Sequence, residues 1–243
     1  MFHSQGPTLQ ELLVQALSST ERGYDLLAPK FDHTPFRTPD AILETAMTHL
    51  NETGSIATAL DVCCGTGAAM WHLRLLCRSR IVGIDFSRGM LAIARRVVAT
   101  APGDATFELV RGNVLDMPFD ATFDVAVCVG ALGHILPRDQ TRFIKQVVKV
   151  LRPGGRFVLV TAPMPSLWSR RYWLLRGFNA VMRIRNFCLS PPFVMYYMTF
   201  LLPQAIALLK QHGFSVDVHH DVFDGHFRYL QLVIGTLHDN HSV

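Results

Sequence analysis

Short apolar runs alternate with segments of helical periodicity over the first two thirds of this chain. The apolar runs are compact, as expected of parallel strands that are buried on both faces. They lie at 56–62, 80–85, 106–110, 123–129 and 156–161. Apolar residues at helical spacing mark predicted helices at 8–17, 39–50, 68–77, 87–98 and 140–151. The alternation predicts a doubly wound α/β sheet with right-handed crossovers and helices on both faces.

This alternation stops after residue 161. Residues 163–203 are apolar, aromatic and arginine-bearing, without a clear strand pattern. A short helix is predicted at 203–211, and two closing strands are predicted at 214–220 and 227–235. We therefore expect a seven-stranded, mostly parallel, Rossmann-like sheet with an α-helical lid insertion. The domain prediction is one domain over 1–243, with a helical cap at 1–50, an ordered loop at 24–39 and the lid at 163–203.

Charge is unevenly distributed along the chain. There are 23 Lys and Arg against 19 Asp and Glu, but residues 140–216 contain no acid and eleven of the 23 bases. Such asymmetry favours an anionic partner or surface near the C-terminal half. The alternative is that these bases neutralise acids elsewhere in the fold.

The cysteines and the N-terminus bear on the compartment. The five cysteines show no CxxC or metal-type spacing, which favours a reducing, cytoplasmic setting and predicts no metal site. Residues 1–8 lack a basic region followed by an apolar stretch, so no signal peptide is expected.

The most informative motif is a strand that ends in Asp61 and feeds a small-residue turn and a helix. Glycine in the turn lets a ligand approach the backbone, and the helix N-terminus offers free N–H groups. Asp85 ends the next strand, twenty residues after Gly65, where a carboxylate suits two ribose hydroxyls. The alternative for Asp85 is a helix-capping acid. Met70 stands where a dinucleotide fingerprint has its third glycine, which favours a smaller adenosine ligand over NAD.

Five motifs follow one another in a familiar order. They are LDVCCGTG at 60–67, GIDFS at 83–87, GNVLDMPF at 112–119, FDV at 123–125 and LRPGG at 151–155. Together they resemble the class I S-adenosylmethionine-dependent methyltransferases, in the style of the type 11 and ubiquinone/menaquinone-biosynthesis groups. The resemblance runs from about residue 24 to 237 and is weakest over 163–203.

That resemblance implies S-adenosylmethionine as cofactor and S-adenosylhomocysteine as product. The residues implied to line the methionine part are Asp61, Gly65, Thr66 and Gly67. Asp85 would bind the ribose and Phe86 would pack on the adenine. The family commonly has a glycine at Cys63, an Asp at Asn113 and an acid at Ala68.

Further cofactor contacts are implied at more distant positions. Asn113 and Val114 would read the adenine edge, and Cys128 and Val129 would lie beside the sulfonium. Tyr24 resembles a residue that closes over the cofactor. Arg37 is expected to pair with the cofactor carboxylate.

His134 follows the fourth strand, at the edge of the sheet where ligands bind in such folds. It is the candidate for orienting or deprotonating the acceptor, because a base helps when the acceptor arrives protonated. The alternative is a structural histidine.

Residues 163–203 bear on the acceptor and on other partners. Aromatic residues such as Trp168 and Trp173 are interleaved with arginines, and prolines interrupt the uncharged run that follows, which disfavours a membrane span. By analogy with the fold, the segment would cover a small-molecule acceptor that is hydrophobic, aromatic or lipid-like. A membrane-surface helix, which would make the protein peripheral to the membrane, and a homodimer interface are further interpretations.

The predicted function is methyl transfer from S-adenosylmethionine to such an acceptor. The alternatives are a non-catalytic protein that binds S-adenosylmethionine or S-adenosylhomocysteine, and a nucleic-acid methyltransferase. The nucleic-acid signal is weak because no RNA-binding module is visible and the arginines lie among apolar residues. A nicotinamide-dependent oxidoreductase is disfavoured by Met70.

Overall fold

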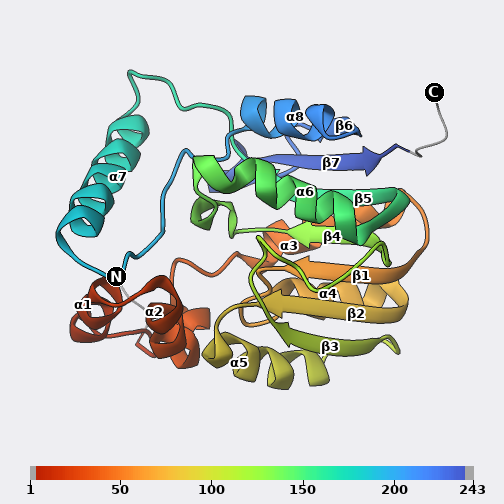
Figure 1. The fold of residues 1–243 in the computed structure, drawn as a ribbon, viewed down its shortest axis with the longest axis horizontal. Helices are drawn as coiled ribbons and strands as arrows, with labels where there is room; N and C mark the ends of the chain where they lie inside the picture. Colours follow the sequence, from red (N-terminus) through yellow and green to blue (C-terminus); the bar gives the residue numbers. More distant parts are fainter. Residues whose placement is uncertain (1–3, 239–243) are drawn as a thin grey trace.

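The computed structural model describes residues 4–238, so both ends of the predicted 1–243 domain lie outside the described residues. Its centre is a seven-stranded sheet of order β3-β2-β1-β4-β5-β7-β6 (Figure 1). The strands are β1 (Ile56–Val62), β2 (Cys77–Asp85), β3 (Thr106–Arg111), β4 (Phe123–Cys128), β5 (Leu151–Thr161), β6 (Phe214–His219) and β7 (Gln231–Leu237). The first five pair in parallel, and β7 is antiparallel to both of its neighbours. The predicted seven-stranded, mostly parallel sheet is confirmed.

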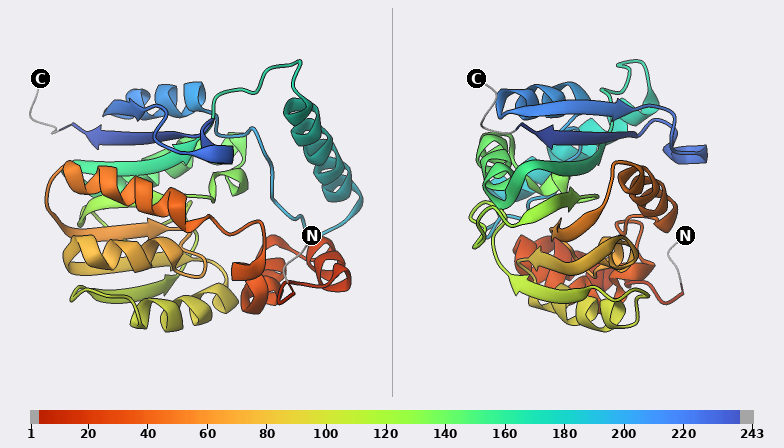
Figure 2. Two further views of the ribbon diagram at one scale, coloured as in Figure 1. Left: turned by 180° about the vertical axis from the view of Figure 1, so that it is seen from behind. Right: turned by 90° about the vertical axis from the view of Figure 1, so that its right-hand side faces the viewer.

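Helices cover both faces of the sheet (Figure 2). They are α1 (Leu9–Leu17), α2 (Thr20–Leu27), α3 (Asp40–Glu52), α4 (Ala68–Leu76), α5 (Arg88–Ala99), α6 (Gln140–Val150), α7 (Arg170–Cys188) and α8 (Leu202–Gln211). One apolar core contains residues of α3, α4 and α5, and the other contains residues of α6 and α8.

The central strands contribute side chains to both cores. Leu60 and Val62 of β1 pack in one core, while Ala59 packs in the other. Because successive side chains of a strand point to opposite faces, a continuous apolar run is required here. This is the burial that the apolar runs predicted.

The strand order reverses between β1 and β4, since β2 and β3 lie on one side of β1 and β5 lies beyond β4. Open α/β sheets bind ligands in the crevice at such a reversal, beyond the carboxyl ends of the strands. The parallel strands point toward the end of the molecule where α1, α2 and α7 lie (Figure 1).

The N-terminal segment is more helical than predicted. Residues 24–33, expected as loop, belong to α2 and to a 3₁₀ turn (Ala28–His33). The Ser19 side chain caps α2 by accepting from the Arg22 N–H at 3.1 Å. In addition, the Asp25 carboxylate accepts from the Gly89 N–H at 2.8 Å. This second contact comes from a helix 64 residues away in sequence, so the local pattern could not reveal it.

Three strand boundaries also differ. β2 begins at Cys77 and β5 at Leu151, earlier than predicted, whereas β7 begins only at Gln231. Residues 152–155, which lie between the predicted helix and the predicted strand, are included in β5 with an irregular register against β4 between Phe123 and Val125. Residues 225–227 form a 3₁₀ turn instead of the start of a strand.

The insertion after β5 contains one long helix, α7, in which Met182 is the buried residue. The helical character predicted for this segment is confirmed. Within residues 4–238, no helix combines the length and the apolar character needed to cross a bilayer.

Candidate functional site

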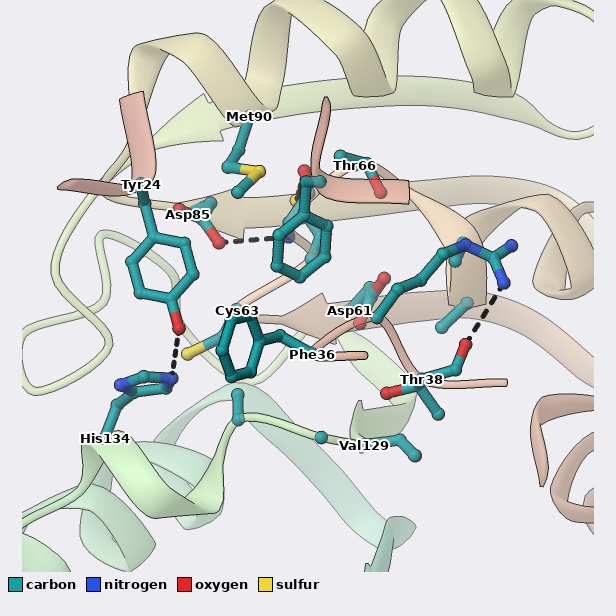
Figure 3. Close-up of a pocket in the computed structure, with 18 of the residues that line it drawn as sticks. Tyr24, Phe36, Thr38, Asp61, Cys63, Thr66, Asp85, Met90, Val129 and His134 are labelled. Carbon is teal, nitrogen blue, oxygen red and sulfur yellow. Dashed lines mark hydrogen bonds between the residues drawn. The ribbon is translucent and has the colours of Figure 1, made fainter. Parts of the chain in front are cut away.

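A cavity lies at the carboxyl ends of β1, β2 and β4 (Figure 3). The loops after these strands supply one part of its lining, and the N-terminal segment around α2 supplies another. The predicted site residues that line it are Tyr24, Arg37, Asp61, Gly65, Thr66, Asp85, Phe86, Val129 and His134. The fold thus brings together residues that are more than 100 positions apart in the sequence.

Four predicted residues do not belong to the described lining, namely Gly67, Asn113, Val114 and Cys128. A Cβ on Gly67 would lie 2.8 Å from Val98 Cγ2, so this glycine permits close packing on α5. The Asn113 side chain accepts from the Leu115 N–H at 2.9 Å. Val114 and Cys128 are buried in the apolar core. Their cofactor contacts stay predictions.

The turn after β1 has the backbone shape of a ligand cradle. Cys63, Gly65 and Gly67 all have positive φ, at 59°, 52° and 84°. Glycine adopts this left-handed conformation without strain, whereas the Cys63 side chain costs about 1 kcal/mol or more there. A Cβ on Gly65 would meet nothing within 4 Å, so the turn presents open space next to its backbone.

Asp85 holds this turn in place. Its Oδ2 accepts from the Gly65 N–H at 3.0 Å, and its Oδ1 accepts from the Ser87 N–H at 2.9 Å. The helix that follows is capped by the Ser87 side chain, which accepts from the Met90 N–H at 3.1 Å, so Asp85 is not itself the cap expected as the alternative. Each carboxylate oxygen keeps a further lone pair, so the same group can also accept from ligand hydroxyls. Burial raises the pKa of Asp85, while the N–H groups of Ser87 and Gly65 counteract that rise.

Asp61 is the less satisfied of the two acids. It is buried, and among the described residues its Oδ2 has no hydrogen-bond partner. Burial, helped by the charge of Asp85, raises the pKa of Asp61 to about 8. A buried carboxyl oxygen without a partner costs free energy, so a positively charged or N–H-bearing ligand group would find a prepared acceptor here.

Tyr24 and His134 form a hydrogen-bonded pair beside these acids. The Tyr24 hydroxyl lies 2.9 Å from His134 Nε2, and His134 Nδ1 lies 2.6 Å from the Val194 carbonyl oxygen. A carbonyl only accepts, so Nδ1 carries the proton and the Nε2 lone pair accepts from the tyrosine. Figure 3 shows the Tyr24 hydroxyl directed at the His134 ring.

Desolvation keeps both members of this pair uncharged. Burial, with a smaller effect of the Asp85 charge, raises the pKa of Tyr24 far above its ordinary value. Burial lowers the pKa of His134, although the Val194 carbonyl opposes this change. The pair is therefore a neutral proton-holding unit at physiological pH.

Arg37 already has two carboxylate partners at the rim of the cavity. Its Nη2 lies 2.6 Å from Asp40 and its Nε lies 3.4 Å from Asp32. The Thr66 hydroxyl donates to Asp32 at 2.7 Å, which ties this rim to the turn after β1. A cofactor carboxylate would share Arg37 with these acids.

Several lining residues were not predicted from the sequence. Phe31, Phe36 and Thr38 come from the segment before α3, and Met90 comes from α5. Met90 lies three residues after the GIDFS motif at 83–87, and this position was a usable signal. The other three carry no local pattern, because only the packing of the N-terminal segment brings them to the cavity.

A second cavity of about 500 Å³ adjoins the first and shares Gly130 and His134 with it. Its lining is mostly apolar and aromatic, with residues of the insertion such as Leu175, Met195, Tyr196, Tyr197 and Phe200. Arg171 is the one permanently charged residue in the described lining, and its guanidinium lies 3.3 Å from the centroid of the Tyr229 ring.

Comparison with known proteins agrees with this geometry. Residues 59–155 match the family model described as a methyltransferase domain. The demethylmenaquinone methyltransferase of Symbiobacterium thermophilum is 36% identical over 109 residues, which are 44% of this chain and 43% of that protein. The enzyme of the same name from Bacillus licheniformis is 33% identical over 131 residues, 52% of this chain and 53% of that protein. The chain thus matches about half the length of these curated relatives, or less.

Solved structures extend the likeness to nearly the whole chain. The complex of DhpI with SAH has a TM-score of 0.66 at 18% identity, covering 96% of this chain and 100% of that one. An O-methyltransferase family protein from Burkholderia thailandensis has a TM-score of 0.68 at 15% identity, covering 96% and 68%. At sequence identities of 15% and 18%, these similarities establish the fold alone.

The matched segment contains the turn after β1 and Asp85 at the end of β2. It also contains most of the parallel strands of the sheet. Residues 59–155 are therefore similar to a methyltransferase domain, and the fold of the chain is similar to that of solved methyltransferase structures.

Proposed function

We propose that this protein is an S-adenosylmethionine-dependent methyltransferase. The observation that carries the proposal is the pair of buried acids, Asp61 and Asp85, beside the open turn at Gly65. Such a site would accommodate an ammonium group, two vicinal hydroxyls and an aromatic base. S-adenosylmethionine combines these groups, and when bound it supplies an electrophilic methyl group.

The residues divide the binding between them. Asp61 would accept from the ammonium group with its Oδ2, which explains why this oxygen has no hydrogen-bond partner within residues 4–238. Asp85 would accept from the ribose hydroxyls while it keeps its hydrogen bonds from the N–H groups of Gly65 and Ser87. Phe86 and Met90 offer apolar surface for the adenine.

The second cavity is the proposed acceptor site. It meets the first at Gly130 and His134, so an acceptor held there would lie next to the cofactor site. Its apolar and aromatic lining supports a small hydrophobic or aromatic acceptor. The name of the relatives, demethylmenaquinone methyltransferase, agrees with an acceptor of that kind.

The Tyr24–His134 pair would handle a proton from the acceptor. Tyr24 Oη donates to Nε2 of His134 and has lone pairs with which to accept from an acceptor hydroxyl. A proton leaving the acceptor would pass to Tyr24 Oη as the tyrosine proton moves to Nε2. The rings of Phe86 and Phe193 contact the Tyr24 ring and would limit the access of water to this place. Holding the reactants in line is the main contribution and is worth roughly 7–11 kcal/mol in favourable cases.

Binding of S-adenosylhomocysteine tests the cofactor site. Asp85→Ala should weaken binding by about 10²–10⁴-fold, because two charge-assisted hydrogen bonds are lost at about 1.5–3 kcal/mol each. Titration calorimetry measures the affinity, and thermal unfolding checks that the variant is folded. The exposed Asp104→Ala serves as the matched control. Unaltered affinity in Asp85→Ala would remove Asp85 from the ribose site.

Turnover is tested separately, with labelled S-adenosylmethionine and a panel that includes demethylmenaquinone and simpler aromatic acceptors. Methyl transfer to an apolar acceptor supports the proposal. Tight binding without transfer to any member would instead favour a non-catalytic binding protein, and transfer to RNA or DNA alone would contradict the small-molecule acceptor.

A further inference from the structure

An exposed apolar surface covers one side of α7 and the segment before it. We define this α7 surface as Trp168, Trp173, Leu174, Val181, Ile184 and Phe187, all of which are exposed. Trp168 is 96% exposed and Phe187 is 92% exposed. Six large apolar side chains gathered in this way exceed the scattered apolar residues of an ordinary protein surface.

The α7 surface has a defined geometry on the helix. With 3.6 residues per turn, Trp173, Val181, Ile184 and Phe187 fall along one stripe, and the buried Met182 lies outside it. Arg176 and Arg183 are exposed and stand two turns apart at one edge of the stripe. No acidic residue occurs between 140 and 216, so the surface is apolar with a purely cationic border.

A second helix extends this surface. Leu9, Leu13 and Leu17 of α1 are exposed at spacings of four residues, which places them on one face. The Arg185 guanidinium of α7 donates to the carbonyls of Ala16 and Ser18 at 2.8 Å each, which fixes α7 against the end of α1. Both helices lie at the same end of the molecule in two views (Figures 1 and 2).

We propose that the α7 surface, continued by the leucines of α1, docks on an anionic lipid membrane. Tryptophan, leucine and phenylalanine on one face with arginine at the edge is the composition of helices that lie in the membrane interface. Anionic headgroups complement Arg170, Arg176 and Arg183. α7 lies on the bilayer and does not cross it, since its 19 residues include five arginines.

A second copy of the chain complements this surface less well. In a two-fold dimer the same patch meets itself, so the three exposed arginines of one copy would face those of the other. No acid on the insertion offsets that repulsion. Glu11 on α1 is already paired with Lys30 at 2.7 Å. Charge therefore favours the lipid surface.

Docking would also place the second cavity near the bilayer. Arg171 and Leu175 line that cavity and belong to the same helix as the α7 surface. An apolar acceptor in that cavity would then lie behind α7, about one helix diameter from the membrane surface. This consequence rests on the proposed function, whereas the docking itself does not.

Vesicle binding tests the docking with the full chain. The probes are vesicles of phosphatidylglycerol and phosphatidylcholine in equal amounts, and vesicles of phosphatidylcholine alone. We expect co-sedimentation with the anionic vesicles, weakened by added salt, and little with the neutral ones. In a Trp71→Phe background, the fluorescence of Trp168 and Trp173 should shift to shorter wavelength on binding.

Two variants separate the charge from the apolar contribution. Arg176→Gln with Arg183→Gln should weaken binding about 25-fold, since each basic residue near an anionic surface contributes about fivefold. Trp173→Ser with Leu174→Ser should weaken it at least about tenfold. The matched controls, Arg95→Gln with Arg96→Gln on α5 and Leu75→Ser on α4, should bind like the unaltered chain.

Several results would overturn the proposal. They are absence of binding to the anionic vesicles, equal weakening by the control variants, or a stable dimer in light scattering that Trp173→Ser with Leu174→Ser dissociates. None of the substituted residues belongs to the proposed catalytic machinery, so S-adenosylhomocysteine affinity stays unchanged in every variant if the surface acts only in docking.

Discussion

Asp61 and Asp85 end neighbouring parallel strands and are both buried, yet their surroundings differ. Asp85 accepts two backbone N–H groups, whereas one oxygen of Asp61 has no partner among the described residues. The structure without ligand therefore carries an electrostatic cost at Asp61. A ligand that brings a cation to this oxygen regains that free energy on binding.

Asp61→Asn should stabilise the ligand-free protein and abolish much of its response to ligand. The pKa of Asp61 is raised to about 8 in the folded state, from 3.8. Between these two values the folded protein holds a proton on Asp61 that the unfolded chain has released. The free energy of unfolding therefore decreases as the pH rises from about 3.8 to about 8. Asparagine has no such titration, so at neutral pH the variant should be more stable by up to about 4 kcal/mol, which is about 1.4 kcal/mol for each pH unit above 3.8.

Thermal unfolding at several pH values measures this difference, which should grow as the pH rises. S-adenosylhomocysteine should raise the unfolding midpoint of the unaltered protein far more than that of Asp61→Asn. Asp104→Asn is the surface control. An Asp61→Asn protein that is less stable and equally responsive to ligand would contradict the argument.

Tyr24→Phe and His134→Gln should lower turnover and leave cofactor affinity nearly unchanged. Each substitution breaks the 2.9 Å contact through which a proton would reach Nε2. General base catalysis accelerates a reaction by about 10²–10⁴-fold. We therefore expect kcat to decrease by up to that factor, while KM for the cofactor changes little. Steady-state kinetics at several pH values provides the measurement. Unchanged kcat in both variants would return His134 to a structural role.

At the scale of elements, α2 is placed by a contact with α5. The Asp25 carboxylate accepts from the Ser87 hydroxyl at 2.6 Å and from the Gly89 N–H at 2.8 Å. It thus serves as a helix cap supplied from a distant segment. Because Tyr24 precedes Asp25, the same contact positions the tyrosine over the cavity.

Asp25→Ala should therefore destabilise the protein and weaken ligand binding together. The loss of two hydrogen bonds at a helix N-terminus costs about 1–3 kcal/mol, which lowers the unfolding midpoint by roughly 2–4 °C per kcal/mol. Asp25→Asn keeps an accepting oxygen and should restore part of both properties. If Asp25→Ala binds S-adenosylhomocysteine normally, α2 does not order the site.

At the scale of the whole molecule, the pH dependence of unfolding reports on the enclosed His134. Burial lowers its pKa below the ordinary 6.5, so below about pH 6.5 the unfolded chain takes up a proton that the folded chain does not. Stability should fall as the pH drops through that region, by at most about 1.4 kcal/mol per pH unit for this residue.

The pKa shift of Asp61 changes the unfolding free energy with pH in the opposite direction. The effect of His134 is therefore isolated by subtracting the unfolding free energy of His134→Gln from that of the unaltered protein. That difference should change below about pH 6.5 and be constant above it. The exposed His226→Gln is the control. A difference in unfolding free energy between the unaltered protein and His134→Gln that stays constant from about pH 5 to about pH 8 would show that burial does not perturb the pKa of the ring.

Much of the fold followed from the apolar pattern. The positions of β1, β3 and β4 were predicted within a residue or so, because strands buried on both faces require continuous apolar runs. The two acids and the glycine turn were likewise recognisable, since the acids lie at the ends of β1 and β2 and the turn follows β1. The boundaries of β5 and β7 were missed where glycine, proline or a 3₁₀ turn obscured the local signal.

The sequence by itself therefore determined the strands and helices of the α/β fold, the glycine turn after β1 and the two acids beside it, because each is signalled by residues near one another in the chain. Only the tertiary structure decided that α2 docks on α5, that Tyr24 meets His134, and that Phe36 enters the cavity. These arrangements depend on contacts between segments 64 to 110 positions apart, and periodicity along a chain carries no information about such contacts.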